Sequence, residues 1–203
     1  MRYSIISIAL FLVSCGSYPK KNNFQTIEIV EKAIVNPYFS DNVKDYVYKA
    51  DINLYKKKFS GIFLVKKTGE DQHRVVFTTE MGNKIFDFTY DKNDFKVNFI
   101  LDKINKKVVV NVLRKDFKVL LKENPAIQGS FSSNDIAVFE TEINKKKHYY
   151  HFDHANGHLI KIVRTANGKE KVKFLFSEIN DNIAEKIQIL HENFQLRIRL
   201  KAI

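Results

Sequence analysis

The strongest constraint on the fold is an alternation of apolar and polar residues with a period of two. Within residues 194–200, every second side chain is apolar and those between are Gln or Arg. Because side chains of a strand point alternately to opposite faces, this pattern predicts a strand with one buried face. Short segments rich in Phe, Tyr, Val and Ile recur between polar turns along the chain. Strands are predicted at residues 46–54, 59–65, 74–79, 84–90, 95–101, 137–143, 148–153, 159–165, 171–176, 186–190 and 194–200.

Two Asn-Gly pairs, at Asn156-Gly157 and Asn167-Gly168, are strong signals for two-residue hairpin turns. If each turn is centred on its pair, Val163 lies opposite Tyr150 on one side and Val172 on the other. The three strands then form a meander with one apolar and one mixed face. The predicted apolar face holds Tyr150, Phe152, Leu159, Val163, Val172, Phe174 and Phe176, and the mixed face holds Tyr149, His151, Asp153, Ile160, Ile162, Arg164, Lys171 and Lys173.

Two segments depart from the period of two. Residues 24–34 carry apolar side chains at helical spacing before Asn36-Pro37, which predicts a short helix. Residues 104–123 suit one helix or two shorter ones, and residues 124–134 predict a long loop. An antiparallel sheet of about eleven strands must curl. We therefore expect a mainly β (α+β) fold, a strongly curled antiparallel half-barrel with short helices over its concave face. A closed barrel, and a filled interior, are the alternatives.

Length and composition indicate one globular domain, expected over residues 24–203. An apolar content of 44% excludes a disordered chain, and only 7 Gly and 3 Pro exclude collagen-like and low-complexity classes. The single cysteine excludes an intrachain disulfide and a cysteine-based zinc site. The 17 Phe residues supply a large apolar area for either a packed core or an apolar cavity.

The first fifteen residues have the features of a bacterial lipoprotein signal. Met1 and Arg2 precede an almost wholly apolar run at residues 5–13, which is too short to span a membrane. The run ends in Leu12-Val13-Ser14-Cys15, which resembles the bacterial lipobox, whose cysteine becomes the acylated first residue of the mature chain. We expect residues 1–14 to be a signal peptide, Cys15 to carry acyl chains such as palmitate, and residues 15–23 to form a tether. A buried core cysteine is the alternative.

Several stretches resemble the LolA/LolB-type superfamily of lipoprotein carriers and receptors. Besides the lipobox, they are the meander that begins near residues 48–52, the stretch Ser60-Gly61-Ile62-Phe63, and residues 77–88. The resemblance spans roughly residues 40–200. It implies a half-barrel with a helical lid that binds the acyl chains of lipoproteins in transit, without covalent chemistry. It also implies that a soluble periplasmic carrier delivers the lipoprotein to the anchored receptor.

Candidate site residues follow from this resemblance. The lining of an apolar cavity is predicted at Phe63, Phe77, Phe86, Phe88, Phe99, Phe174 and Phe176, with a packed core as the alternative for each. The family receptor presents an apolar residue on a protruding loop, whereas the early hairpin loop here, residues 66–71, is entirely polar. Ile127 and Phe131, in the predicted long loop, are candidate substitutes for that insertion residue.

A metal site is not indicated by the clustered histidines. His148 and His154 share a strand face but lie about 20 Å apart at ~3.3 Å per residue, and His151 points the opposite way. A zinc ion needs several ligands at about 2 Å. We expect these histidines and His158 to be exposed at strand ends, with no metal and no cofactor.

Catalysis has no support in the sequence either, so we expect no enzyme. Glu80, Asp87 and Asp91 are predicted to face solvent, because their neighbours alternate with Phe. Ser132-Ser133 lacks a nucleophile elbow, and no glycine-rich phosphate loop occurs.

The net charge of +11 arises partly from three lysine runs, at residues 56–58, 106–107 and 145–147. Nucleic acid is a poor partner for an exported protein despite this charge. Anionic lipid headgroups or an acidic partner protein fit better, and a solvated surface is the alternative.

These observations predict a lipid-anchored outer-membrane protein that binds acyl chains or lipidated proteins in lipoprotein sorting or lipid transfer. The first charged residues after Cys15 are Lys20 and Lys21 rather than an acidic run, which favours a periplasm-facing anchor. The expected partners are lipoproteins, the membrane and a soluble periplasmic carrier. The alternative is a structural adaptor lipoprotein with a filled interior and no lipid. An envelope hydrolase would need a nucleophile or an acid pair.

Overall fold

The computed structural model describes residues 16–92 and 94–203, so Cys15 and the predicted signal peptide lie outside the described residues. The described part contains one antiparallel sheet of thirteen strands, a short 3-10 helix and two α-helices. The elements are α1 (Tyr18–Lys21), β1 (Gln25–Ile27), β2 (Asp45–Leu54), β3 (Lys57–Gly69), β4 (Gln72–Thr78), β5 (Lys84–Asp91), β6 (Asp94–Ile100), η1 (Asp102–Ile104), α2 (Lys107–Leu121), β7 (Ile127–Ser133), β8 (Ile136–Ile143), β9 (Lys146–Asp153), β10 (Leu159–Ala166), β11 (Lys169–Asn180), β12 (Ile183–His191) and β13 (Leu196–Ala202). None of these helices is long and apolar enough to cross a membrane.

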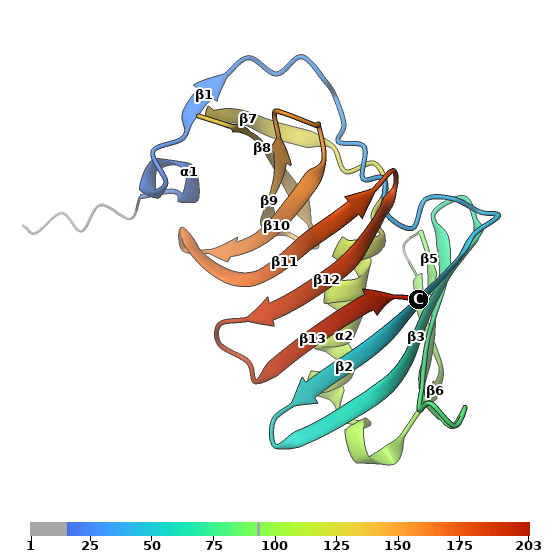
Figure 1. The fold of residues 1–203 in the computed structure, drawn as a ribbon. Helices are drawn as coiled ribbons and strands as arrows, with labels where there is room; N and C mark the ends of the chain where they lie inside the picture. Colours follow the sequence, from blue (N-terminus) through green and yellow to red (C-terminus); the bar gives the residue numbers. More distant parts are fainter. Residues whose placement is uncertain (1–15, 93) are drawn as a thin grey trace, which may run out of the picture.

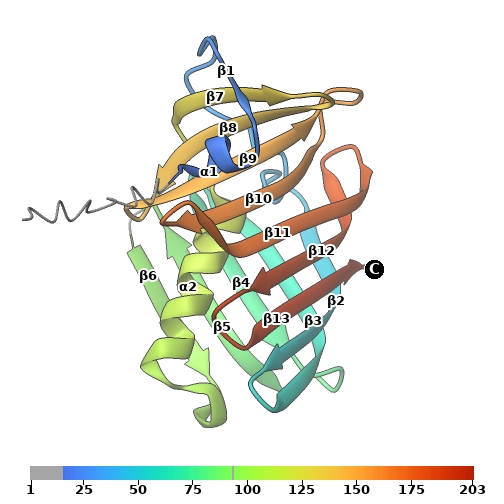
Figure 2. The same cartoon turned by 90° about the vertical axis from the view of Figure 1, so that its left-hand side faces the viewer.

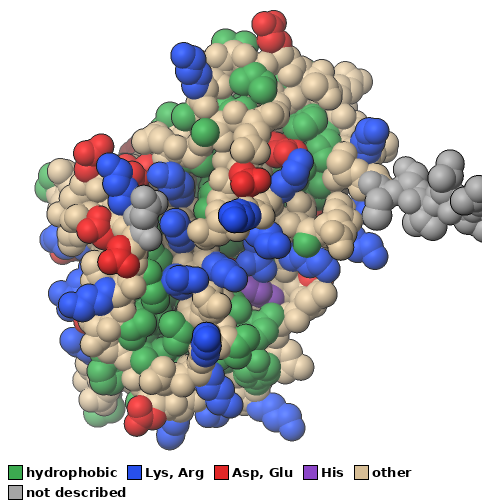
Figure 3. Space-filling model, turned by 180° about the vertical axis from the view of Figure 1, so that it is seen from behind, with side chains coloured by type: hydrophobic (Ala, Val, Ile, Leu, Met, Phe, Trp, Pro, Cys, Tyr) green, Lys and Arg blue, Asp and Glu red, His purple; other side chains and the backbone are tan. Residues whose placement is uncertain are grey.

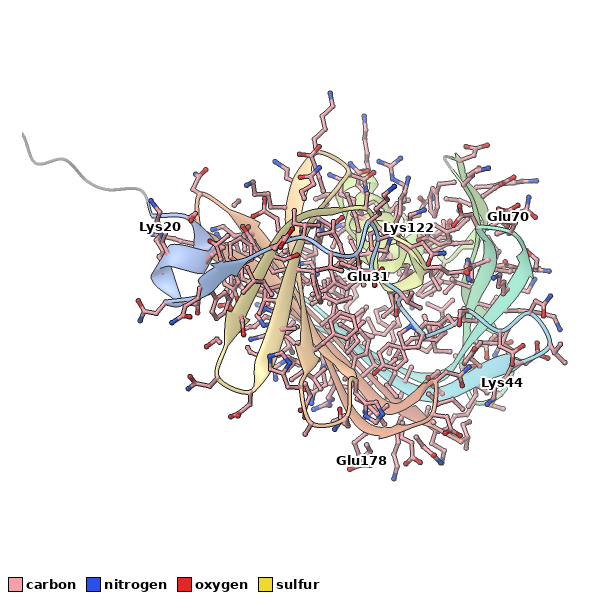
Figure 4. The ribbon with its side chains drawn as sticks, turned by 90° about the horizontal axis from the view of Figure 1, so that it is seen from above. Lys20, Glu31, Lys44, Glu70, Lys122 and Glu178 are labelled. Carbon is pink, nitrogen blue, oxygen red and sulfur yellow. The ribbon has the colours of Figure 1, made fainter. Side chains whose placement is uncertain are left out.

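The sheet consists of two meanders that join at the centre. Strands β2 to β6 form one meander and β7 to β13 the other, and β13 pairs with β2. The order ends in β1 at one edge and β6 at the other, so the sheet is open (Figure 1). Figure 4 shows the sheet curled into a U, with side chains filling the space between its arms. The helix α2 links the last strand of the first meander to the first strand of the second and lies on the concave side (Figure 2).

The predicted mainly β half-barrel is therefore confirmed, with two strands more than expected. Each of the eleven predicted segments overlaps an observed strand, and the additional strands are β1 and β7. The predicted helical segment at residues 104–123 is also confirmed, as η1 followed by α2. The local alternation of apolar side chains identified these elements because each strand buries one face.

The predicted helix at residues 24–34 is wrong. Residues 25–27 form β1, which pairs with β7, and the remainder is extended or irregular. Of the apolar residues at helical spacing, only Ile34 enters the core, whereas Val30 is 84% exposed. Phe24 packs on a different apolar cluster from Ile34, so these side chains do not form one helix face, and residues 25–27 pair with β7 at the sheet edge instead.

The predicted loop at residues 124–134 is wrong for the same reason. Residues 127–133 form β7, which lies between β1 and β8. A bulge between Ile127 and Gly129 accommodates the glycine. The backbone groups of β7 form hydrogen bonds with β1 and β8. The local sequence pattern does not indicate this pairing.

The register around the two Asn-Gly turns matches the prediction only in part. Ala166 faces Lys169 across Asn167-Gly168, as expected. Bulges between Leu159 and Lys161 and between Arg164 and Thr165 then shift the strands. Ile162 consequently lies opposite Tyr150 and Phe174, facing the core, which corrects its predicted place on the mixed face.

The same shift moves two other residues to unexpected faces. Val163 pairs with Tyr149 and Lys173 instead of Tyr150 and Val172, and it lies on the side of the sheet away from the core. Arg164 takes the place opposite Val172 and faces inward, toward α2. A one-residue register shift exchanges the two faces of a strand, so a single bulge has this effect.

A second, smaller apolar cluster covers the outer face of β8, β9 and β10. Tyr18 of α1 packs on Tyr149, with ring centroids 4.6 Å apart, and beside Phe24. Val138 and Val163 complete this cluster. The aromatic side chain of Tyr18 is only 2% exposed. The segment predicted as a tether therefore packs against the domain at Tyr18.

Candidate functional site

The concave face of the sheet is filled by aromatic side chains. Phe63, Phe77, Phe86, Phe88, Phe174 and Phe176, six of the seven residues predicted to line a cavity, are buried there. The rings of Phe86 and Phe88 stack with centroids 4.7 Å apart. Phe99 differs from the prediction: it lies opposite Asp87 on β5 and is 40% exposed, so it does not face the interior.

Helix α2 closes the concave face with an amphipathic surface. Val109, Leu113, Phe117 and Leu120 recur at intervals of three or four and are all buried. The Phe117 ring lies 5.3 Å from that of Phe63 and 5.8 Å from that of Phe86. The helix is thus held mainly by apolar packing, which has no directional requirement.

An apolar groove opens from the core where α2 begins. It has a volume of about 340 Å³ and lies between the β2–β3 turn and the segment that joins η1 to α2. Leu54, Ile104 and Val109 form its apolar lining, and all three belong to the main core. A second groove of about 490 Å³ shares Tyr55, Lys56 and Gln195 with the first. Ligand sites commonly measure ~300–1,000 Å³, so either groove is large enough to hold part of an acyl chain.

Basic side chains surround these grooves. The smaller groove is lined by Lys56, Lys57, Lys103 and Lys106, and the larger groove by Lys56, Lys58 and Arg197. Lys57 donates a hydrogen bond to the backbone carbonyl of Lys103 at 3.2 Å, which ties the two sides together. No carboxylate is found among the described residues lining either groove. The fold therefore brings two lysine runs, distant in sequence, to one apolar opening.

A buried polar group lies under the middle of α2, and the sequence analysis missed it. The Asp116 carboxylate accepts a hydrogen bond from His191 Nε2 at 2.7 Å, and both side chains are at most 2% exposed. Arg164 Nη1 lies 3.9 Å from the second carboxylate oxygen. The available signal was an acidic residue inside the apolar stripe of a helix, because such a residue needs a buried partner.

The acidic residues predicted to face solvent do so only in part. Glu80 and Asp91 are exposed, but Asp87 is fully buried. Arg74 holds its carboxylate through two hydrogen bonds of 2.7 and 3.0 Å, and Lys84 and Asn98 also donate to it. These donors, Arg74 foremost, lower the pKa of Asp87 to about 2. The ion pair with Arg74 explains how the Asp87 carboxylate is buried.

The four clustered histidines separate as the strand pattern predicted, but two of them are buried, contrary to expectation. His148 faces the core side and His151 the outer side beneath Tyr18 and Phe24, each 1% exposed. Burial lowers the pKa of His148 to about 4 and that of His151 to about 3. His154 is exposed and His158 half-exposed. Among the described residues, no three potential metal ligands lie together.

The two insertion candidates lie in a strand. Ile127 is half-buried against the main core, and Phe131 packs near Tyr149, with ring centroids 6.5 Å apart. The premise that they occupy a protruding loop is therefore wrong.

No protein-family model matches this sequence, and no curated protein is similar to it in sequence. Among solved structures, similar folds are found in a LolA superfamily protein from Nitrosomonas europaea, with 8% identity and a TM-score of 0.49 over 83% of this chain and 88% of that one. A DUF1329 family protein from Desulfovibrio piger has 10% identity and a TM-score of 0.41 over 79% and 84%. A protein described as an outer membrane lipoprotein-sorting domain, from Vibrio parahaemolyticus, has 10% identity and a TM-score of 0.40 over 78% and 83%.

The chain is similar in fold to these proteins.

Proposed function

We propose that this protein is a non-catalytic envelope lipoprotein that binds an acyl chain, alone or on a lipidated protein, between α2 and the sheet. The observation that carries the proposal is the apolar groove at the start of α2. Its lining of Leu54, Ile104 and Val109 continues into the core, and its rim is basic. An acyl chain attached to an anionic headgroup matches an apolar lining with a cationic rim.

The helix α2 would act as the lid. Most of its contacts with the sheet are apolar, so an acyl chain can replace them by contacts of the same kind. Each methylene group of the acyl chain that is removed from water contributes about 0.8 kcal/mol to the free energy of binding, whether it packs on the helix or on the sheet. The Asp116–His191 hydrogen bond provides a fixed point about which the first turns of the helix can separate from the β2–β3 side.

Membrane attachment is proposed through Cys15, which precedes the described residues. Gly16 lies so close to Gly168 that a Cβ on Gly168 would come within 2.2 Å of the Gly16 carbonyl. The Tyr18 side chain is anchored on the outer face of the sheet. An acylated Cys15 would therefore hold the domain close to the bilayer, in our proposal at the periplasmic side of the outer membrane.

The decisive experiment is lipid mass spectrometry on the full chain, produced in a bacterial periplasm with Cys15 replaced and purified without detergent. A bound acyl lipid or lipopeptide at near-stoichiometric yield is expected. A fluorescent fatty-acid probe then measures affinity. Tyr55, at φ +52° and 49% exposed, lines both grooves, and Tyr55→Asn suits that backbone conformation.

We expect Tyr55→Asn to weaken probe binding about tenfold, because an aromatic contact contributes on the order of 1–2 kcal/mol. The matched control is Val43→Asn, at a position 87% exposed and outside both grooves. An empty protein that also fails to bind the probe would refute the proposal. It would favour a structural adaptor, a function that the filled concave face supports.

A further inference from the structure

A separate cavity of about 190 Å³ lies beside the C-terminal half of α2, outside both grooves. The helix, the β8–β9 turn and the ends of β10 and β11 enclose it. Its lining consists of Lys115, Val119, Ile143, Asn144, Lys146, His148, Arg164, Thr165, Ala166 and Lys171. Its volume suits a small polyatomic ion or a headgroup rather than an acyl chain.

The cavity has a strongly positive lining. Lys115, Lys146, Arg164 and Lys171 contribute four permanent cations, and no carboxylate belongs to the lining that the structure describes. None of the three lysines forms an ion pair with a described residue. Basic side chains gather across the middle of the face of the molecule that carries α2 (Figure 3). Like charges around a concave site attract an anion.

Arg164 has donors available for such an anion. Its Nη1 forms an ion pair with Asp116 Oδ1 at 3.9 Å, which is beyond hydrogen-bond distance, and His191 bonds the other oxygen, Oδ2. The guanidinium group has five N–H donors and matches the oxygens of a phosphate group. The bulge next to Arg164 turns this side chain inward, so the strand geometry itself places the guanidinium group here.

We propose that this cavity binds a phosphate group. Arg164 and the lysines hold its charged oxygens. Free phosphate and the phosphomonoester headgroup of a lipid share this chemistry. The site is independent of the acyl groove.

Isothermal titration calorimetry of the full chain with potassium phosphate at pH 7 tests the proposal. We expect one phosphate site per chain. Arg164→Gln should weaken phosphate binding at least ~10-fold, because it removes a charge-assisted contact. Lys171→Gln, which keeps Arg164, should weaken it by a smaller factor and serves if Arg164→Gln does not fold. The control is Arg199→Gln, at an exposed arginine outside the cavity.

Vesicles of phosphatidylcholine with and without phosphatidic acid distinguish the two sources. Binding of free phosphate identifies a soluble ligand. Binding only to vesicles that contain phosphatidic acid, lost in Arg164→Gln, identifies a headgroup. The proposal is overturned if neither phosphate source binds, or if Arg199→Gln reduces binding as much as Arg164→Gln.

Discussion

Replacing Phe117 by alanine tests directly whether α2 packs as a lid on a filled concave face. The side chain has no exposed surface and lies between the rings of Phe63 and Phe86. Truncation removes both contacts and leaves a cavity at the centre of the helix–sheet interface. The matched control is Val108→Ala, which changes the same helix at a position that is 51% exposed.

The expected loss of stability follows from the burial. Phe→Ala at a fully buried site costs about 3–5 kcal/mol. Alanine is the better helix former by ~0.5 kcal/mol, so we expect a net loss of about 2.5–4.5 kcal/mol for Phe117→Ala. Val108→Ala should stay within about 0.5 kcal/mol of wild type. A domain of this size has a total stability of only ~5–15 kcal/mol, so the difference is large.

Urea unfolding followed by far-ultraviolet circular dichroism measures both variants. A lower midpoint at an unchanged m-value is the expected signature for Phe117→Ala. If α2 must leave the sheet for an acyl chain to bind, the same variant should bind the fatty-acid probe more tightly, because less packing is lost on opening. A loss below about 1 kcal/mol, or equal losses in both variants, would refute the described packing of α2.

Two further predictions concern the outer face of the sheet. His151 stays neutral in the folded protein because burial lowers its pKa to about 3, whereas the unfolded chain binds a proton below about pH 6.5. Stability should therefore fall as the pH drops from about 6.5 toward 3, by about 2 kcal/mol between pH 7 and 5 for this residue. His151→Phe should reduce the slope of stability against pH, which urea midpoints measure. Part of the slope should remain, because burial also lowers the pKa values of His73 and His148. An unchanged slope would contradict this account. Tyr18→Ala removes the ring that packs on Tyr149 and the hydroxyl that donates to Glu170 at 3.2 Å, so it should release the N-terminal segment. Trypsin should then cleave faster at Lys20 and Lys21 with little change in the urea midpoint, and Ser17→Ala is the control; a cleavage rate like that of wild type would show that Tyr18 does not hold the segment.

The sequence predicted the strands well where one face alone is buried. In β13, apolar and basic residues alternate without exception from Leu196 to Lys201, and the observed burial alternates with them. The apolar stripe of α2 was equally readable. The predictions failed for β1 and β7, where apolar spacing is weak or misleading and pairing with a neighbouring strand decides.

The candidate sites depended on contacts that no local pattern contains. Two lysine runs meet at one groove because the β2–β3 turn and the start of α2 come together when the sheet curls. Asp116 and His191 are 75 residues apart in sequence yet form a buried hydrogen bond. Arg164 faces inward because of a bulge, and it was predicted on the mixed face.

The sequence by itself determined the class of fold, because burial of one face imposes a period of two on a strand and about 3.6 on a helix. It also determined that the interior would be aromatic, because most of the 17 Phe side chains have to be buried away from water. Only the tertiary structure decided which side chains change to the other face of the sheet at the bulges. It also decided which basic residues lie close together and where cavities remain. Those outcomes depend on the pairing and curvature of distant strands, and the energy of each pairing is shared by residues far apart in the chain.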